Sequence, residues 1–562
     1  MTKKIIECVP NFSEGKDLAI IEKISSEIKG VDGVKLLSVE PGKDTNRTVV
    51  TFVGNPNQVI EAAFLAIKKA AELIDMSKHT GEHPRMGATD VCPLIPVSGV
   101  TMKEVIKYSK ILAEKVGSEL NIPVYLYEKS AKNKERENLA NIRSGEYEEL
   151  ENKLKNPDWK PDFGTDSFGL TKKTGATVIG ARDFLIAYNI NLNTTSTRRA
   201  NAIAFDVREK GRIARKGGKL TGKILRDKNN NPIWKPGSLK NVKAIGWFIE
   251  EYGVAQISMN LTNIKKTPIH IVFDEVCRSA QKRGIRVTGS ELIGLIPLES
   301  MIEAGKYFLK KQQRSCGISE DEIIKIAIKS MGLDELEIFN PKEKIIEYSI
   351  KEKTKKLCDL DLTQFAQTTA SESPAPGGGS ISAYIGALGG ALATMVANLS
   401  SHKRGWDKKW SFFSKIAEEG QYYINELLDL VDKDTEAFNE IINSFRLPEK
   451  TKEEKKIKKQ AILDSTINAI KVPLKIMEQS EKSLDIIKIM ATEGNPNSVS
   501  DAGVAALCAR SAVIGGYLNV KINCKELEDK TLAKKFINQA EKIRKSAIKK
   551  EKEIISITLK KI

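Results

Sequence analysis

The chain has 562 residues, 41% of them hydrophobic and 29% charged, a composition that argues against disorder and supplies apolar side chains for packed cores. The chain is too long to fold around a single hydrophobic core, so several domains are expected. Lys and Arg number 90 against 73 Asp and Glu, which gives a formal net charge of +17. We interpret this excess chiefly as lysine on solvated helix faces. A small polyanionic ligand is the second interpretation, because a nucleic-acid surface would interleave aromatic residues with basic ones.

The seven cysteines are scattered, odd in number and never spaced as a zinc pair, which favours a reducing compartment and no metal. The opening "MTKKIIECVPNFSEG" is basic, but Glu7 and Pro10 interrupt its apolar run too early for a signal peptide. We therefore expect a cytoplasmic protein.

The first third of the chain alternates strand-like and helix-like segments. In order, these are a strand at 4–12, a helix at 18–30, strands at 34–42 and 46–54, a helix at 56–74 and a strand at 91–97. Two strands that pair between two helices indicate a ferredoxin-like, split βαβ layout. An apolar run at 175–192 restarts the pattern, so we predict two α/β subdomains, 1–178 and 179–336.

The remaining segments are a basic insertion, a linker and a helical domain. Residues 214–241 are basic and rich in Gly and Asn, which predicts a long exposed hairpin or loop. A charged linker at 337–362 precedes an all-α helical bundle at 363–562. The uncharged stretch 373–401 imitates a membrane span, but its Gly, Ala and Ser content favours a helix in the centre of a soluble bundle.

The stretch "HTGEHPRMGATDVCPLIPV" holds two of the four histidines, His79 and His83. Gly and Pro between and beside them oppose a helix, so we predict a loop that ends in a buried strand. On a fixed loop, His83 is a candidate general acid or base and Arg85 a candidate ligand for a substrate carboxylate. A histidine held by backbone groups in a turn is an equally good interpretation, and no third ligand suggests a metal.

Other candidate substrate-binding residues lie beside expected strands, where loops commonly carry ligand groups: Asn11, Asp44, Asn46 and Arg47. In the helical domain, "APGGGS" places Gly377, Gly378, Gly379 and Ser380 at a helix start, where backbone N–H groups can approach a ligand closely. Asn495, Asp501 and Asn519 follow as candidates that suit either a polar ligand or interhelical hydrogen bonds.

A carboxylate also falls on an apolar helix face. In "QYYINELLDLVDKDTEAFNEIINSF", the apolar residues form one stripe at helical spacing, which includes Val431, Phe438 and Phe445. Asp434 lies on that stripe, whereas Asp432 points away from its centre. A carboxylate on a buried face is costly unless it is paired or used, so Asp434 is either catalytic or part of an interhelical hydrogen bond.

Taken together, these stretches resemble the formimidoyltransferase-cyclodeaminase family over nearly the full chain. The matching segments are "ECVPNFSEGKD", "DTNRTVVTFVG", "HTGEHPRMGATDVCPLIPV", "PDFG", "GARDFLIAYNINL", "PKEKIIEY", "APGGGS", "LVDKDTEAF" and "VPL". The resemblance implies transfer of a formimidoyl group from N-formimidoyl-L-glutamate to tetrahydrofolate, followed by ring closure to 5,10-methenyltetrahydrofolate with release of ammonia.

The resemblance also assigns residues. It implies that His83 is the transferase histidine and that Asp432 or Asp434 serves the cyclodeaminase, a choice that the stripe makes in favour of Asp434. The family's folate-binding segment maps to Gly164, Thr165, Asp166, Ser167, Phe168, Gly169, Lys172 and Lys173. It further implies polyglutamylated folate, for which the basic charge suits the tail, and a homo-oligomer. A methenyltetrahydrofolate cyclohydrolase activity of the helical domain, and a basic nucleic-acid-binding or scaffold protein, remain the alternatives.

Overall fold

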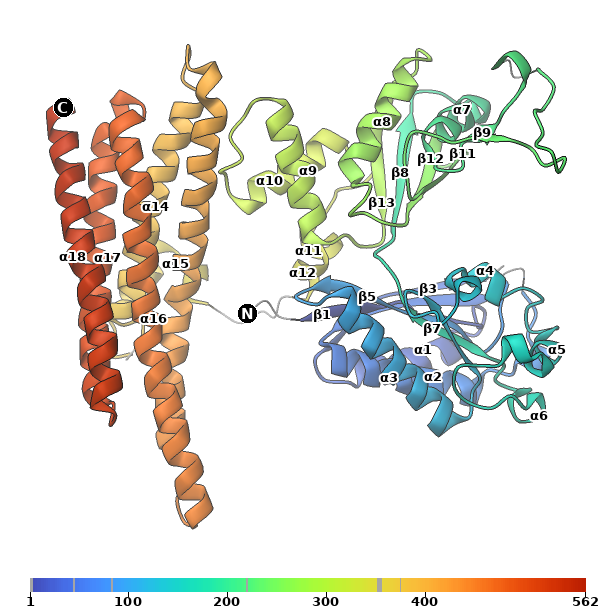
Figure 1. The fold of residues 1–562 in the computed structure, drawn as a ribbon, viewed down its shortest axis with the longest axis horizontal. Coiled ribbons are helices and arrows are strands. Elements are labelled where there is room, and N and C mark those ends of the chain that lie inside the picture. The colour runs from blue at the N-terminus through green and yellow to red at the C-terminus, as the bar shows by residue number, and fades with distance from the viewer. Residues whose placement is uncertain (1–3, 44–45, 82–83, 219–220, 351–355, 374) are drawn as a thin grey trace. The chain divides into compact units, whose positions relative to one another are not determined.

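The computed structural model describes residues 4–43, 46–81, 84–218, 221–350, 356–373 and 375–562. Its chain forms two compact units. The first comprises Met1–Met301 with Met331–Lys351, and the second Ile302–Ser330 with Glu352–Ile562. The first unit is α/β and the second is almost entirely helical (Figure 1), as the sequence predicts.

The first subdomain is a ferredoxin-like βαββαβ unit extended by two strands. Its strands are β1 (Ile5–Cys8), β2 (Asn11–Phe12), β3 (Val34–Gly42), β4 (Arg47–Gly54), β5 (Thr89–Ser98), β6 (Val124–Glu128) and β7 (Thr177–Ala181). Strand β3 pairs with β4, β4 pairs with the interrupted strand β1–β2, and β5 lies on the other side of that strand. Beyond β5, β7 and β6 add in parallel. The predicted split βαβ layout is therefore confirmed.

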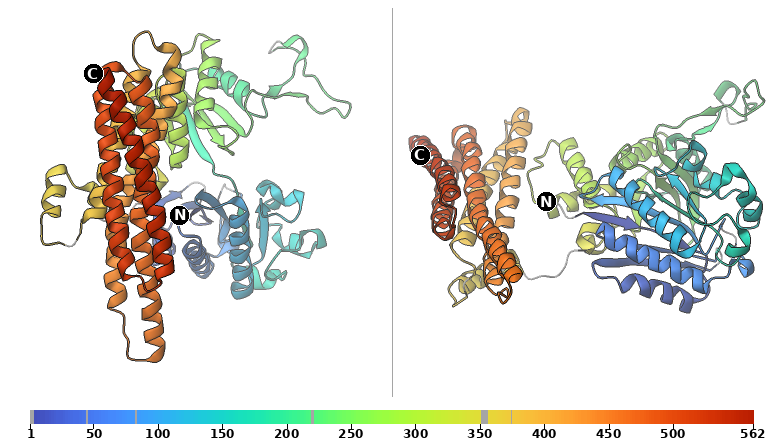
Figure 2. Two further views of the ribbon diagram at one scale, coloured as in Figure 1. Left: turned by 60° about the vertical axis from the view of Figure 1, so that its left-hand side comes forward. Right: turned by 60° about the horizontal axis from the view of Figure 1, so that its bottom comes forward.

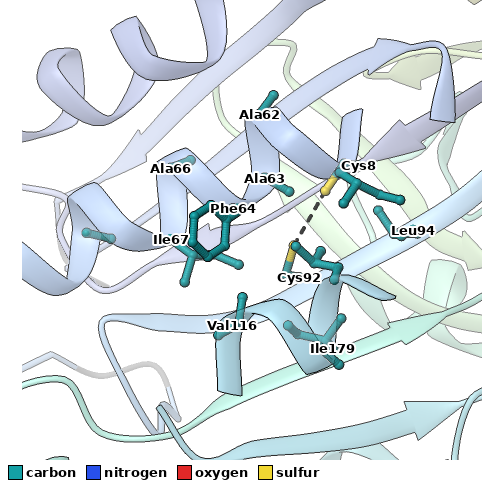
Figure 3. Packing of buried hydrophobic residues seen from close by; sticks show 14 of the residues in the cluster. Cys8, Ala62, Ala63, Phe64, Ala66, Ile67, Cys92, Leu94, Val116 and Ile179 are labelled. Atoms are coloured by element: carbon teal, nitrogen blue, oxygen red, sulfur yellow. Dashed lines mark hydrogen bonds between the residues drawn. The ribbon is translucent and has the colours of Figure 1, made fainter. Parts of the chain in front are cut away.

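Three helices pack on this sheet: α1 (Leu18–Lys29), α2 (Pro56–Leu73) and α3 (Met102–Leu120). Their apolar faces meet β1 and β5 in a core where the Sγ atoms of Cys8 and Cys92 lie 3.5 Å apart, next to Phe64 and Ile67 of α2 (Figure 3). The connection from β6 to β7 carries only short helices: η2 (Lys134–Glu137), α4 (Leu139–Ile142), α5 (Leu150–Lys155), η3 (Pro157–Trp159) and α6 (Phe168–Thr171). A further short helix, η1 (Met76–Lys78), follows α2.

The second subdomain repeats the same topology. Its elements are β8 (Ile186–Leu192), α7 (Thr197–Val207), β11 (Val242–Ile249), β12 (Val254–Leu261), α8 (Ile269–Gln281) and β13 (Val287–Ile293). The strands pair antiparallel in the order β11-β12-β8-β13. Between α7 and β11 the predicted basic insertion forms a ribbon that includes β9 (Arg212–Ile213) and β10 (Trp234–Lys235) and extends beyond the sheet and its helices (Figure 1).

The second unit is a bundle of five long helices that run side by side (Figure 2). They are α14 (Gly378–Ser401), α15 (Trp410–Phe445), α16 (Lys452–Glu493), α17 (Val499–Glu526) and α18 (Lys530–Lys561), preceded by η5 (Leu357–Asp359) and α13 (Leu362–Thr369). Gly389 allows α14 to approach α17 closely, because a Cβ there would lie 2.9 Å from the carbonyl oxygen of Ala505. Two segments, Gly378–Ser401 and Pro496–Glu526, are long and apolar enough to cross a membrane by length and composition alone, and α14 is mostly buried as a core helix.

The second compact unit also includes residues 302–330, which lie within the range 179–336 that we predict for the second subdomain. These residues comprise the end of α9 (Leu298–Lys311) and most of α10 (Glu320–Met331). The backbone N–H of Cys316 donates to Ser414 Oγ at 3.0 Å, and Asn398 Nδ2 donates to the carbonyl of Gly317 at 2.8 Å. Within the predicted linker, 337–362, lie the short helices α11 (Pro341–Lys344) and α12 (Ile346–Ser349). Glu347 of α12 accepts a hydrogen bond from the N–H of Leu298.

Candidate active sites

A cavity of about 540 Å³ in the first unit gathers charged side chains from both α/β subdomains. Its walls hold two carboxylates, Glu128 and Asp183, and the amide of Asn11. Six cations line it: Arg47, Lys129, Arg143, Arg182, Lys243 and Lys266. This excess of positive charge suits a ligand with several carboxylates.

Buried ion pairing fixes part of that wall. Asp90 on β5 is fully buried, accepts the backbone N–H of Met86 at 3.0 Å and pairs with the Arg143 guanidinium. Burial and the nearby positive charge of Arg143 lower the pKa of Arg47, although Asp90 opposes them. Arg47 and Arg143 are thus crowded cations, and an anion between them would relieve their repulsion.

The loop that precedes Asp90 is anchored from three sides. His79 Nε2 lies 3.0 Å from the carbonyl oxygen of Asn46, and Arg85 Nε donates to His79 Nδ1 at 3.3 Å. Burial lowers the pKa of His79, so its ring favours the neutral form. The guanidinium of Arg85 contacts Glu146 at 2.8 Å and Glu148 at 2.7 Å. Binding of a substrate carboxylate by Arg85 would therefore have to displace a glutamate.

Two of the predicted residues, His83 and Asp44, lie outside the described residues. Among the described residues nearby, Asn46 Nδ2 donates to the carbonyl of Thr80 at 2.8 Å, which ties the two segments together. Asn11 and Arg47 line the cavity, whereas Asn46 serves the loop anchor.

The predicted folate segment lies at the surface, on the loop before α6 and on α6 itself. Gly164 needs its glycine, because its φ is +82° and a Cβ would lie 2.0 Å from the carbonyl oxygen of Ile122. The ring of Phe168 packs 5.9 Å from that of Tyr147, and Lys173 Nζ donates to the carbonyl of Glu72 at 2.6 Å. None of Gly164, Thr165, Asp166, Ser167, Phe168, Gly169, Lys172 and Lys173 is among the residues that line the 540 Å³ cavity.

A second site forms where α15 meets the start of α14. The backbone N–H of Ser380 donates to Asp434 Oδ2 at 2.8 Å, and the Ser380 hydroxyl lies 3.0 Å from the same oxygen. Burial raises the pKa of Asp434, while both contacts from Ser380 oppose that rise. A Cβ on Gly379 would lie 2.0 Å from Asp434 Oδ1, so this glycine makes room for the carboxylate. Gly378 faces the Asn519 amide in the same place.

Asp432 has a different environment. Its Oδ1 accepts the backbone N–H of Leu357 at 2.7 Å, and burial together with this carboxylate raises the pKa of the Cys358 thiol to about 12. Asp432 therefore holds the chain entering the bundle, and Asp434 faces the glycines. The predicted stripe is wrong at its far end, because Phe438 and Phe445 are 37% and 57% exposed.

Asn495 and Asp501 lie elsewhere. The N–H of Asn495 donates to Ser400 Oγ at the far end of α14. Asp501 begins α17, and the 18 residues to Asn519 correspond to about 27 Å along a helix. The structure therefore brings together Gly377, Gly378, Gly379, Ser380, Asn519 and Asp434, without Asn495 or Asp501.

Three family models match this chain in succession. They are "Formiminotransferase domain, N-terminal subdomain" at residues 5–182, "Formiminotransferase domain" at 187–351 and "Formiminotransferase-cyclodeaminase" at 361–542. Formimidoyltransferase-cyclodeaminase of Mus musculus is 41% identical over 534 residues, which span 95% of this chain and 94% of the mouse protein. The chain belongs to the formimidoyltransferase-cyclodeaminase family.

Two further relatives match one part of this family member each. Glutamate formimidoyltransferase of Thermoplasma acidophilum is 42% identical over 308 residues, 54% of this chain and 92% of that protein. Methenyltetrahydrofolate cyclohydrolase of Methylorubrum extorquens is 33% identical over 177 residues, 32% of this chain and 85% of that protein. The two halves of the family architecture thus also have separate relatives.

Sequence reasoning missed most of the cations that line the 540 Å³ cavity. Arg143, Arg182, Lys243 and Lys266 lie far apart in the sequence, and only the fold brings them together. Among the described residues, no group of three or more His, Cys, Asp or Glu side chains is arranged to hold a metal ion.

Proposed function

We propose that this chain catalyses two consecutive folate reactions of histidine degradation. The first transfers the formimidoyl group of N-formimidoyl-L-glutamate to tetrahydrofolate, and the second converts 5-formimidoyltetrahydrofolate to 5,10-methenyltetrahydrofolate and ammonia. The observation that carries the proposal is full-length family membership together with two separate polar sites, one in each unit.

In the transferase step, folate nitrogen 5 attacks the amidine carbon, and the bond from that carbon to the glutamate nitrogen breaks. The attacking nitrogen loses a proton and the departing nitrogen gains one, which His83 relays as general base and then general acid. The six cations of the 540 Å³ cavity bind the glutamate carboxylates. Its two carboxylates, Glu128 and Asp183, suit the cationic amidine.

In the cyclodeaminase step, folate nitrogen 10 attacks the same amidine carbon and ammonia leaves. The Asp434 carboxylate stabilises the cationic amidine, takes the proton that nitrogen 10 loses and passes it to the departing nitrogen, which leaves as ammonia. Burial raises the pKa of Asp434 and so makes the protonated carboxyl more accessible at neutral pH. Ser380 holds the carboxyl in position, and Gly379 leaves space beside it.

A coupled assay with His83→Ala tests the assignment. Wild-type enzyme with both substrates should yield methenyltetrahydrofolate absorbance and ammonia. The variant should lose the transfer by about 10²–10⁴-fold and still cyclise supplied 5-formimidoyltetrahydrofolate. His79→Ala is a matched comparison, because that ring packs against Asn46 and Arg85 as an anchor. Failure of wild-type enzyme to form the methenyl product would refute the proposed function.

The second candidate function concerns the helical unit alone. Similarity to a methenyltetrahydrofolate cyclohydrolase favours hydrolysis of 5,10-methenyltetrahydrofolate in the same pocket. Supplying that compound and measuring the decay of its absorbance distinguishes the two: cyclodeaminase alone predicts no decay above the uncatalysed rate, and hydrolase activity predicts decay that Asp434→Asn abolishes.

We propose that the folate substrate is polyglutamylated and that neither reaction uses a metal ion. The charge of +17 and the cations around the transferase cavity support binding of a polyanionic tail. Passage of 5-formimidoyltetrahydrofolate from the first site to the second should become less efficient at high salt and with monoglutamyl folate. An overall rate that is the same under both conditions would contradict binding of the tail.

We propose that the protein is cytoplasmic and that it forms a homo-oligomer through the surface of the helical bundle. Helices α14 and α17 expose a row of large apolar side chains, each 37–61% accessible: Leu388, Met395, Leu399, Val504, Leu507, Leu518 and Ile522. Such a row marks a protein contact in a soluble protein. Light scattering should show that Leu518→Glu dissociates the assembly while Leu559→Glu, on α18, leaves it intact. Equal masses for both variants would contradict this contact.

A further inference from the structure

A cavity of the second α/β subdomain lies away from the proposed transferase site. It has a volume of about 840 Å³ and is bounded by the ends of α7 and α8 and by the β9–β10 ribbon. It shares no lining residue with the 540 Å³ cavity. Its volume falls within the range of pockets for small ligands.

The cavity carries a strong excess of positive charge. Its two carboxylates are Asp206 and Glu275, and its six cations are Arg208, Arg212, Arg215, Lys235, Arg278 and Lys282. Both carboxylates are already engaged inside the protein. Asp206 pairs with Arg212 and, at 2.5 Å, with Arg283, while Glu275 forms a two-point pair with Arg278 at 2.6 and 2.9 Å.

Three cations, Arg208, Arg215 and Lys235, have no carboxylate partner in the part of the chain that the structure describes. Lys282 lies close enough to Glu275 to help lower the pKa of that carboxyl but forms no salt bridge with it there. Arg208 is fixed in place, because its Nε donates to the carbonyl of Gly211 at 2.9 Å and its guanidinium lies 4.1 Å from the ring centre of Phe205. Burial and the charge of Arg212 lower the pKa of Arg208. Like charges held this closely favour an anion between them.

The ribbon that closes this cavity is built against α7. A Cβ on Gly211 would lie 1.9 Å from the carbonyl oxygen of Lys235, and a Cβ on Gly237 would lie 2.2 Å from that of Arg208. The N–H of Ser238 donates to the carbonyl of Asp206 at 2.8 Å. Two glycines thus let the ribbon meet the end of the helix, which fixes Lys235 over the cavity.

We propose that this cavity binds a small ligand with two or more phosphate groups, at a site separate from both folate sites. Phosphate chains concentrate several negative charges in a small volume, and arginine forks match phosphate oxygens in two-point contacts. Phe205, Ile213, Trp234 and Pro236 add apolar wall that a carrier ring or chain would contact. The ligand is a nucleotide or another polyphosphate, and both share this chemistry.

Calorimetry on the full chain with inorganic tripolyphosphate tests the proposal. We expect one site per chain, and affinity that falls about tenfold or more as salt rises from about 50 to about 500 mM. The double variant Lys235→Gln/Lys282→Gln should weaken binding about tenfold. We expect this variant to fold as the wild type does, because neither lysine forms a salt bridge in the described structure. Lys216→Gln/Lys228→Gln removes the same charge from the ribbon outside the cavity and should change affinity by less than about twofold.

Further ligands separate the sources. Equal affinity for tripolyphosphate and ATP identifies the phosphate chain as the whole determinant, and tighter ATP binding that Trp234→Ala removes identifies a nucleotide. Transfer activity should be unchanged in every variant, since none of these residues lines the transferase cavity. No heat with tripolyphosphate, equal weakening in both double variants, or tighter binding of pentaglutamate or of a 12-nucleotide RNA would overturn the proposal.

Discussion

The two units present charge to their substrates in different ways. One spreads many cations over a cavity, and the other relies on a single carboxyl. The transferase cavity is wide and lined by charges from strand ends and loops, which are held by pairs such as Asp90 with Arg143. The proposed cyclodeaminase site is built around one carboxyl, Asp434, packed against the glycines at the start of α14. A surface that carries many cations should keep its activity when one of them is removed. A site that depends on one half-buried carboxyl should lose its activity with that carboxyl.

The largest expected effect is therefore at Asp434. Asp434→Asn keeps the size of the side chain. It removes the negative charge and the group that passes a proton to the departing nitrogen. Cyclisation should fall by about 10³-fold while transfer is unchanged, because loss of one electrostatic partner at a transition state costs about 10²–10³ and the acid role adds to it. Methenyltetrahydrofolate absorbance from supplied 5-formimidoyltetrahydrofolate measures it.

Asp432→Asn is the control for that variant. Asp432 accepts the N–H of Leu357, so its loss should loosen the chain entering the bundle and reduce cyclisation by less than about tenfold. A ranking of the two variants in the reverse order would assign the catalytic role to Asp432.

The glycines beside Asp434 test whether close packing itself is required. Gly379→Ala places a Cβ 2.0 Å from Asp434 Oδ1 and must move the carboxyl, so cyclisation should fall about 10²-fold, because small displacements of a positioned group are costly. Gly378→Ala is the matched variant, since its Cβ would lie at an ordinary 3.4 Å from Asn519 Nδ2. If both alanines reduce cyclisation equally, the effect comes from the helix start and the carboxyl contact is irrelevant.

Glu7 supplies the contrasting buried carboxyl of the transferase unit. Burial raises its pKa to about 7, and the charge of Arg182 opposes this rise only in part. Between the unfolded pKa near 4.5 and about 7, the folded protein binds the extra proton, so stability falls as pH rises through this window. Above about pH 7 the penalty reaches about 3 kcal/mol.

Glu7→Gln should accordingly exceed wild type by less than about 1 kcal/mol at pH 5 and by about 2–3 kcal/mol at pH 8. The measurement is the urea midpoint for loss of transferase activity at each pH. Glu40→Gln, on an exposed position of β3, controls for a general charge effect. A constant difference between wild type and Glu7→Gln across this pH range would show that Glu7 does not titrate in the folded protein.

How far the sequence predicts each site follows from how each is built. Periodicity predicted the ferredoxin-like order of strands and placed Asp434 on the packed side of its helix, because both depend on local spacing. That Gly379 lies against Asp434 depends on the register between α14 and α15, which no local pattern specifies. Arg182 and Lys266 lie far apart in the sequence and line one cavity only through the fold. The boundary of the second compact unit at Ile302 lies in the first turns of α9, where composition gives no boundary signal.

The smallest expected effect concerns the shared cationic surface of the transferase cavity. Lys266→Gln removes one of six cations from the wall, so the KM for pentaglutamyl tetrahydrofolate should rise about three- to tenfold with kcat unchanged. Lys265→Gln removes the adjacent exposed charge outside the cavity and should leave KM within about twofold. The difference should disappear in high salt, since screening weakens exposed charge pairs. If instead kcat falls with KM constant, Lys266 acts on the reacting groups, and the transferase site depends on single residues as strictly as the cyclodeaminase site does.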